Sequence, residues 1–534
     1  MTGFPLPATD AGKPPAFADL AGCNDWLAAQ PLVNAPLMQE VLADQLDRLN
    51  GCAIAARERF KIVETLRKAV FAIETESIKR YEYRPLPLSP VEQKTFAASC
   101  RLWRGLTTGY LHCLRACLDG DDSLAERQAK ICHRTLTSLR LEQLSRYRAG
   151  AEIPGDWWQL LHAALAATDQ LDVGDTAISD RLFAETREST PKAQYAMAIL
   201  LHLSRPYELS RSQFSATRRW LARWRERAAL RLTAAAARDS RSHAIDLESD
   251  TPVLAAGARA RNPRWLTIDG ILAKFKNRIQ GLRDGQNPED LKLGTGLPAD
   301  ACVALLQYLH GALQTPPPTL PANAPPLRTV GVQSTVDSIY LLLGGKRLGV
   351  EDAPTAQSNR RVHEQIAIFG HAVDSQRDAP AAPPPEDWQL LAEPDTPSGA
   401  DLSLRRAAGS TGERISSRSL IAVVDPQHGG PVLAMVRSVV ALADGTLFAV
   451  ARRLPGEPRP IAANGREKMT NRIVQHPALY LPAAGQVSKP PASLFIPAGA
   501  LAKLTRLDAP DLPPGLKLGA AMDRGANYER LRCE

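Results

Sequence analysis

The sequence predicts a multidomain protein in which an all-α region, either a helical bundle or a short solenoid, is joined by a proline-rich linker to a small all-β barrel. Upstream of residue 315, apolar side chains recur at intervals of three and four residues in long segments, which indicates amphipathic helices. Downstream, short β-branched runs are separated by Gly, Pro and Asp, which indicates strands. Between the two regions, residues 315–326 contain six prolines in twelve positions. Proline fixes φ and removes an amide donor, so this stretch is predicted to be an extended spacer.

The size and composition indicate a folded, cytoplasmic protein. A chain of 534 residues is too long for one core, and 44% hydrophobic with 23% charged residues is typical of globular proteins. The N-terminus shows no basic segment followed by an apolar one, and no run of about 18 apolar residues occurs in the chain. The eight cysteines are widely spaced, which favours reduced thiols over a disulfide scaffold. The net charge of +8 favours anionic partners only weakly.

The helical domain is predicted to span residues 36–314, after a flexible N-terminus at residues 1–35. Ser89 and Pro90 suit the start of one helix, and Gly150 suits the end of another. The segments with helical spacing are 37–50, 55–81, 89–120, 121–150, 153–171, 189–206, 210–232, 263–285 and 298–313. Residues 236–262, rich in Ala, Arg, Ser and Asp, are predicted to be an exposed connection that breaks the domain.

The β half begins with a predicted connection at residues 327–350, which consists of a strand at 327–334 and a short helix that Gly344 and Gly345 close. A barrel is predicted for residues 351–508, because closure leaves no exposed strand edge. Its candidate strands are 361–373, 387–394, 399–407, 419–426, 431–442, 446–454 and 459–463. Residues 509–534, rich in Pro and Gly, are predicted to be a loosely ordered tail.

Two short stretches in this half suggest a ligand site. Residues 359–365 place the pair Arg360 and Arg361 before the first candidate strand, and residues 394–399 form a polar turn that ends in Gly399. The order and spacing of these pieces resemble those of a PilZ domain, a β-barrel bacterial receptor for cyclic di-GMP. The PilZ pattern has an RxxxR segment and a D/N-x-S-x-x-G turn. Here the turn has Pro394 at its first position and Thr396 at its third.

The resemblance implies that one dinucleotide bridges the arginine segment and the turn. Arginine can pair bidentately with phosphate oxygens and stack on a base, and glycine allows the backbone to approach the ligand closely. An arginine on a central strand, here Arg437, could add a further cation. The candidate ligand-binding residues are Arg360, Arg361, Asp395, Thr396, Ser398, Gly399 and Arg437.

The arginine-rich segment 211–231 offers a second kind of site. Its basic residues are interleaved with Trp220 and Trp224, so it could lie along phosphates and stack on exposed bases of a nucleic acid. The two tryptophans are four residues apart and therefore share one helix face. The simpler interpretation is that they anchor this helix in a core while the arginines face water.

No motif indicates an enzyme, a cofactor or a metal centre. The nearest approach to a metal cluster is His112, Cys113, Cys117, Cys132 and His133. Zinc needs about four convergent ligands, and this group contains no CxxC pair, so packing of buried cysteines is the favoured interpretation. The glycine-rich segment 344–349 lacks the spacing of a phosphate-binding loop.

Taken with the resemblance, these observations predict a cytoplasmic bacterial signalling protein. Its PilZ-like domain would bind cyclic di-GMP, or derive from a domain that does, and its helical region would dock an unknown protein partner. Two alternatives remain open: a ligand-free interaction scaffold, and nucleic-acid binding through the arginine-rich helix. The amphipathic helices could also pair between subunits, which leaves the oligomeric state open.

Overall fold

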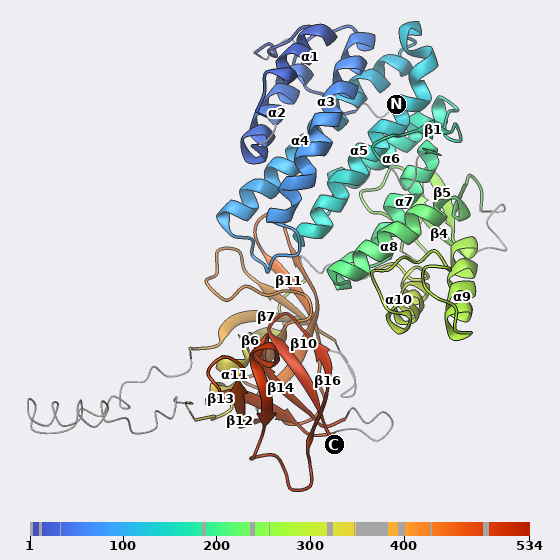
Figure 1. The fold of residues 1–534 in the computed structure, drawn as a ribbon. Helices are drawn as coiled ribbons and strands as arrows, with labels where there is room; N and C mark the ends of the chain where they lie inside the picture. Colours follow the sequence, from blue (N-terminus) through green and yellow to red (C-terminus); the bar gives the residue numbers. More distant parts are fainter. Residues whose placement is uncertain are drawn as a thin grey trace, which may run out of the picture. The chain divides into compact units, whose positions relative to one another are not determined.

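The computed structural model describes residues 4–9, 13–31, 34–183, 188–234, 241–255, 257–317, 324–346, 348, 383–392, 401–427, 430–483 and 491–534. It divides into two compact units: a helical unit, Met1–Arg84 with Leu88–Thr319, and a strand-rich unit, Pro85–Pro87 with Leu320–Glu534. The predicted fold class, a helical region followed by a strand-rich region with a closed barrel, is confirmed (Figure 1).

Helices occupy most of the first part of the helical unit. In chain order they are α1 (Leu20–Ala28), α2 (Ala35–Asn50), α3 (Ala56–Ser77), α4 (Pro90–Leu118), α5 (Gln128–Ala149), α6 (Gly155–Gln170), α7 (Pro191–Leu203) and α8 (Arg211–Trp224). Their boundaries follow local chemistry. Ser89 Oγ accepts from the Glu92 amide while Glu92 accepts from the Ser89 amide, so a capping box starts α4. Gly150 ends α5 in the left-handed conformation, at φ 67°.

Helix α4 packs closely against α2 and α3, and small residues allow this approach. A Cβ at Gly109 would lie 2.8 Å from Val63 Cγ2 of α3, and a Cβ at Gly105 would lie 3.1 Å from Leu46 Cβ of α2. The buried apolar faces of α1 to α8 belong to one continuous core. Figure 1 shows α3, α4 and α5 running beside one another.

The N-terminus contains structure where a flexible segment was predicted. Asp19 caps α1, and within this helix Cys23 is fully buried. Phe17 is also buried, with its ring 5.5 Å from that of Trp26. The hydrophobic residues of this short segment are too few to show a helical period by themselves, and they become ordered by joining the core of α2 and α3.

The predicted exposed connection at residues 236–262 is also wrong in part. Within it, β4 (Ser242–Asp246) joins a three-stranded sheet in the order β3 (Ala229–Arg231), β5 (Pro263–Thr267), β4. The predicted helix at 263–285 therefore begins as strand β5, and only α9 (Asp269–Arg283) is helical. Helix α10 (Ala299–Ala312) follows, and the short strands β1 (Ile178–Ser179) and β2 (Glu188–Ser189) pair with each other. Pairing with β5 is what orders β4, and a single strand carries little sign of it in the sequence.

The strand-rich unit contains a closed six-stranded barrel. Its strands are β6 (Arg328–Gln333), β7 (Glu386–Ala392), β8 (Asp401–Arg406), β9 (Leu420–Val424), β10 (Val432–Ala441) and β11 (Leu447–Arg453). They close in the order β10-β11-β8-β7-β6-β9. Alternate side chains fill the interior, as on β8, where Leu402, Leu404 and Arg406 are buried.

The barrel does not match the predicted residues 351–508. It closes through β6, which belongs to the predicted connection at 327–350, and it ends at β11. Strand β6 is followed by α11 (Val336–Leu342), which ends before Gly344 at φ 85°, as predicted. The candidate strand at 361–373 lies outside the described residues.

A second sheet holds the remaining strands, in the order β15-β12-β13-β14-β17-β16. These are β12 (Arg459–Glu467), β13 (Ile473–Leu481), β14 (Ser493–Pro497), β15 (Leu504–Asp508), β16 (Leu518–Arg524) and β17 (Tyr528–Cys533), with the four-residue helix α13 (Ala500–Lys503) before β15. The predicted loose tail is therefore wrong, because β16 and β17 lie within it. Tyr528 of β17 is fully buried against Phe495, and both belong to a core that includes residues of α11, β9 and β10.

Candidate functional site

Most of the predicted ligand site falls outside the described residues. Arg360 and Arg361 lie there, as do Asp395, Thr396, Ser398 and Gly399 of the predicted turn. Arg437 is described, together with Asp401, which follows Gly399 by two positions. The geometry around these two residues therefore defines the described part of the candidate site.

Arg437 occupies a β-bulge on β10. Val436 pairs with Ala451 of β11 and Ser438 pairs with the next residue along, Val450, so Arg437 is the additional residue between them. A bulge bends its strand and re-aims the side chain of the extra residue, and such irregularities are common beside binding sites. The regular inward and outward alternation of β10 therefore does not fix the direction of Arg437.

The Arg437 side chain forms an ion pair with Asp401, the first residue of β8. Arg452 of β11 approaches the other carboxylate oxygen, with Nε 3.3 Å from Asp401 Oδ1. The three side chains are 26%, 28% and 56% exposed for Arg437, Asp401 and Arg452, so solvent reaches the group. Two guanidinium groups and one carboxylate thus lie at the start of β8. An incoming phosphate would compete with Asp401 for Arg437.

The arginine-rich helix α8 is built as a core helix. Trp220 and Trp224 are 1% and 5% exposed, their rings stack with centroids 6.3 Å apart, and Trp220 Nε1 donates to Leu293 O. The prediction that the tryptophans share a buried face is confirmed, so neither ring is available to stack on a base in the folded unit. Arg211 pairs with Glu82, and Arg223 donates to the Lys292 carbonyl.

In the cysteine and histidine group, the three cysteines and His133 are buried, and His112 is half-buried. Burial raises the pKa of Cys113 and Cys132 to about 12, which keeps these thiols protonated. His133 instead joins a polar network, with Nε2 2.7 Å from Ser189 Oγ. Among the described residues, no group of three or more His, Cys, Asp or Glu residues could hold a metal ion.

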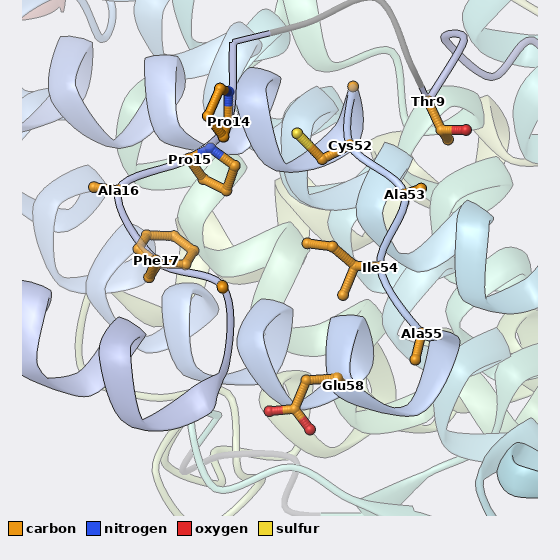
Figure 2. Close-up of a pocket in the computed structure, with 12 residues that line it drawn as sticks. Thr9, Pro14, Pro15, Ala16, Phe17, Cys52, Ala53, Ile54, Ala55 and Glu58 are labelled. Carbon is orange, nitrogen blue, oxygen red and sulfur yellow. The ribbon is translucent and has the colours of Figure 1, made fainter.

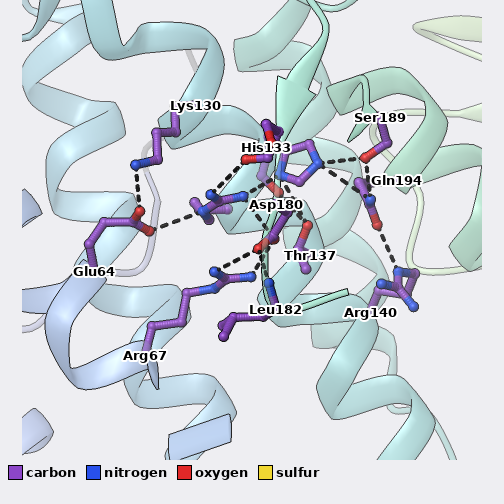
Figure 3. Close-up of polar contacts among 12 residues, drawn as sticks. Glu64, Arg67, Lys130, His133, Thr137, Arg140, Asp180, Leu182, Ser189 and Gln194 are labelled. Carbon is purple, nitrogen blue, oxygen red and sulfur yellow. Dashed lines mark hydrogen bonds and ion pairs between the residues drawn. The ribbon is translucent and has the colours of Figure 1, made fainter. Parts of the chain in front are cut away.

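Sequence reasoning missed a buried charged network between α3, α5 and the β1–β2 region (Figure 3). Arg67 and Arg134 both donate to the Asp180 carboxylate, which also accepts from the Leu182 amide. All three charged side chains are at most 5% exposed. Arg134 also contacts Glu64, which Lys130 approaches at 2.6 Å. Burial alone would raise the pKa of Glu64, but Arg134 and Lys130 lower it to about 2.

A groove at the start of the helical unit also has room for a ligand. It has a volume of about 780 Å³ and is lined by residues 14–18 and 51–55 together with Thr9 and Glu58 (Figure 2). The Glu58 carboxylate already accepts from the Leu20 amide and pairs with Lys61. Its lining is mainly Pro, Ala and Ile, so it offers few polar groups to orient a ligand.

Comparison with known proteins gives a match in the helical unit. Residues 21–236 match the family model described as the N-terminal domain of the cyclic-di-GMP receptor FimW. The match runs from α1 to just beyond β3 and includes the whole buried charged network. It does not include the barrel, where the resemblance to a PilZ domain was drawn. No curated protein and no solved structure matches the chain.

Proposed function

We propose that this protein is a signalling receptor for cyclic di-GMP that acts in the cytoplasm by binding and not by catalysis. The observation that carries the proposal is the similarity of residues 21–236 to the N-terminal domain of a cyclic-di-GMP receptor. The barrel that follows offers a second, independent element of support, since the sequence resemblance to a PilZ domain falls on it. Among the helices of the described residues, none has the length and apolar character needed to cross a membrane.

The ligand would bind at the barrel surface beside Arg437. Arg360 and Arg361 would supply guanidinium groups, and residues 395–399 would supply the polar turn. Support comes from the ion pair between Arg437 and Asp401, because Asp401 directly continues from the predicted turn into β8. Arg437 is thereby held beside the first residue of β8, which follows the predicted turn in the sequence. Its partial exposure leaves its charge accessible to a phosphate.

The helical unit would be the output surface, which docks a protein partner. Ligand binding can change this output only to the extent that the ligand prefers one arrangement of the protein over another. A dinucleotide that joins the segment with Arg360 and Arg361 to the barrel would supply such a preference, because its contacts are complete only when both parts are in place.

Isothermal titration calorimetry of the full chain with cyclic di-GMP tests this proposal. We expect saturable binding to the wild type and a loss of affinity of about tenfold or more in Arg437→Ala and in Arg360→Ala/Arg361→Ala, because each removes charge-assisted hydrogen bonds to phosphate. Arg506→Ala is the matched control, since Arg506 is an exposed arginine on β15 of the other sheet.

The absence of heat at high micromolar cyclic di-GMP would contradict the receptor proposal. Wild-type affinity in both arginine variants would contradict the assignment of the site. A functional readout that stays unchanged in the double variant would instead favour the ligand-free scaffold.

A further inference from the structure

The hairpin between β12 and β13 carries two apolar side chains into solvent. The strands pair as far as Arg466 and Ile473, which lie directly opposite each other and therefore share one face of the sheet. In the turn that joins them, residues 467–472, Met469 is 96% exposed, and Ile473 at its end is 60% exposed. Single exposed apolar residues are common, but two on one turn form a small apolar surface that the unit leaves uncovered.

Backbone hydrogen bonds fix the shape of this turn. The Glu467 amide donates to Arg472 O at 2.9 Å, which closes the turn. The Lys468 amide donates to Lys503 O at 2.9 Å, which joins the turn to the end of α13. Met469 is thus presented on a hydrogen-bonded backbone, so little conformational entropy is lost when a partner covers it.

Positive charge surrounds the two apolar side chains. Four exposed basic residues lie on the turn, beside it on β12 and at the end of α13, namely Arg466, Lys468, Arg472 and Lys503. The one carboxylate in residues 464–475 and 500–503 is Glu467, so these segments carry a net charge of +3. Within the described residues, Glu467 accepts from the Thr470 hydroxyl at 2.7 Å and pairs with none of the four cations. We call these four residues, with Met469 and Ile473, the basic turn.

The cations of the basic turn keep donors available to a partner. Lys468 Nζ donates to Ala502 O at 2.9 Å, and Arg466 Nη1 donates to Asn471 Oδ1 at 3.2 Å. An ammonium has three N–H donors and a guanidinium has five, so both exposed side chains retain donors that face water. Their aliphatic stems can lie along an apolar surface while the charged heads stay at its polar boundary.

We propose that the basic turn binds the surface of a bilayer that contains anionic phospholipids. Met469 and Ile473 enter the boundary between headgroups and acyl chains, and the four cations contact the headgroups around them. Such peripheral binding combines an apolar surface with a rim of Lys and Arg. Each cation near an anionic membrane raises the affinity about fivefold, so four of them act strongly together. The inference does not rest on the proposed function.

The composition of the basic turn favours a lipid surface over a nucleic acid or a protein. Residues 464–475 and 500–503 contain no aromatic side chain. Single-stranded nucleic acids bind by stacking on aromatic rings, and protein interfaces are centred on aromatic anchors. A bilayer needs neither, because it takes up an apolar side chain directly beside its anionic headgroups. This matches both features of the turn, its apolar tip and its cationic surroundings.

Co-sedimentation of the full chain with vesicles tests the proposal, in the absence of cyclic di-GMP. We expect binding to phosphatidylcholine vesicles with about 30% phosphatidylglycerol that weakens as salt is raised, and none to phosphatidylcholine alone. Lys468→Gln/Arg472→Gln should lower the affinity about tenfold or more. Lys517→Gln/Arg532→Gln is the matched control, because it removes two exposed cations at the opposite edge of the same sheet and should bind like the wild type.

A second variant separates lipid insertion from attraction to any polyanion. Met469→Ser keeps every charge and should still lower the affinity about threefold or more. Its control is Met522→Ser, at a 41% exposed position on β16, which should bind like the wild type. The proposal is refuted if the wild type does not bind the anionic vesicles, or if the two double variants lose affinity equally. Wild-type affinity in Met469→Ser would also overturn it, and would assign the basic turn to a nucleic acid or an acidic protein.

Discussion

At the scale of single residues, the helical unit buries more charged side chains than the composition of the chain suggests. Arg67, Arg134 and Asp180 are buried together, and each guanidinium has more than one acceptor. A buried ion pair contributes little net stability, because desolvation offsets the attraction, but removal of one partner leaves an unpaired buried charge. We therefore expect this network to fix the relative positions of α3, α5 and the β1–β2 region.

Acid should weaken the helical unit through Glu64. Its pKa in the folded protein is about 2, below the ordinary 4.5, so between these values the unfolded chain binds more protons. The stabilisation is complete above pH 4.5 and is lost as the pH falls towards 2, with a total on the order of 3 kcal/mol. Urea unfolding of the wild type and Glu64→Gln, followed by far-UV circular dichroism at pH 7, 5 and 3, measures this.

The variant should be less stable at pH 7 and should lose less stability between pH 5 and 3. Glu76→Gln is the control, since Glu76 pairs with Lys79 at an exposed site. Parallel acid sensitivity in the wild type and Glu64→Gln would show that other carboxylates cause the effect.

At the scale of elements, helix boundaries are set by specific caps. Ser89→Ala removes the side-chain acceptor for the Glu92 amide and should cost about 1 kcal/mol of unfolding free energy. The midpoint of urea denaturation measures this loss. Val91→Ala, at an exposed first-turn position of the same helix, should be neutral or slightly stabilising. A similar loss in both variants would show that the cap does not stabilise α4.

The long helices could be predicted because each shows several turns of amphipathic spacing and a recognisable cap, as α4 does with Ser89 and α5 with Gly150. Helix α1 and strand β4 could not, because each is short and becomes ordered only by packing against distant residues. Strands β16 and β17 were missed because the prolines and glycines before them obscured a short alternation in Tyr528–Cys533.

The candidate sites could be predicted less well from the sequence than the fold could. Arg437 was found through a family resemblance, but its bulge depends on the register between β10 and β11, which one sequence does not reveal. The pairing of Arg67 with Asp180 joins residues 113 positions apart, and no local spacing encodes it.

At the scale of the whole molecule, the C-terminal residues are structural. Truncation after Asp508 removes β16 and β17, which exposes β14 along the edge where β17 pairs and uncovers Phe495. We expect the shortened protein to lose the unfolding transition of the strand-rich unit and to aggregate. Differential scanning calorimetry and analytical size exclusion measure this.

Tyr528→Ala is the matched point variant and should lower the same transition, since it empties a fully buried aromatic position at a cost of about 3–5 kcal/mol. A truncated protein that keeps the wild-type transition would show that the last two strands are dispensable.

The closure of the barrel through β6 has a practical consequence for dividing the chain. Strand β6 pairs with both β7 and β9. A cut near residue 350 would remove β6 from the barrel, and the backbone amides and carbonyls of β7 and β9 that pair with it would lose their partners. A fragment intended to isolate the strand-rich half must therefore start ahead of Leu327.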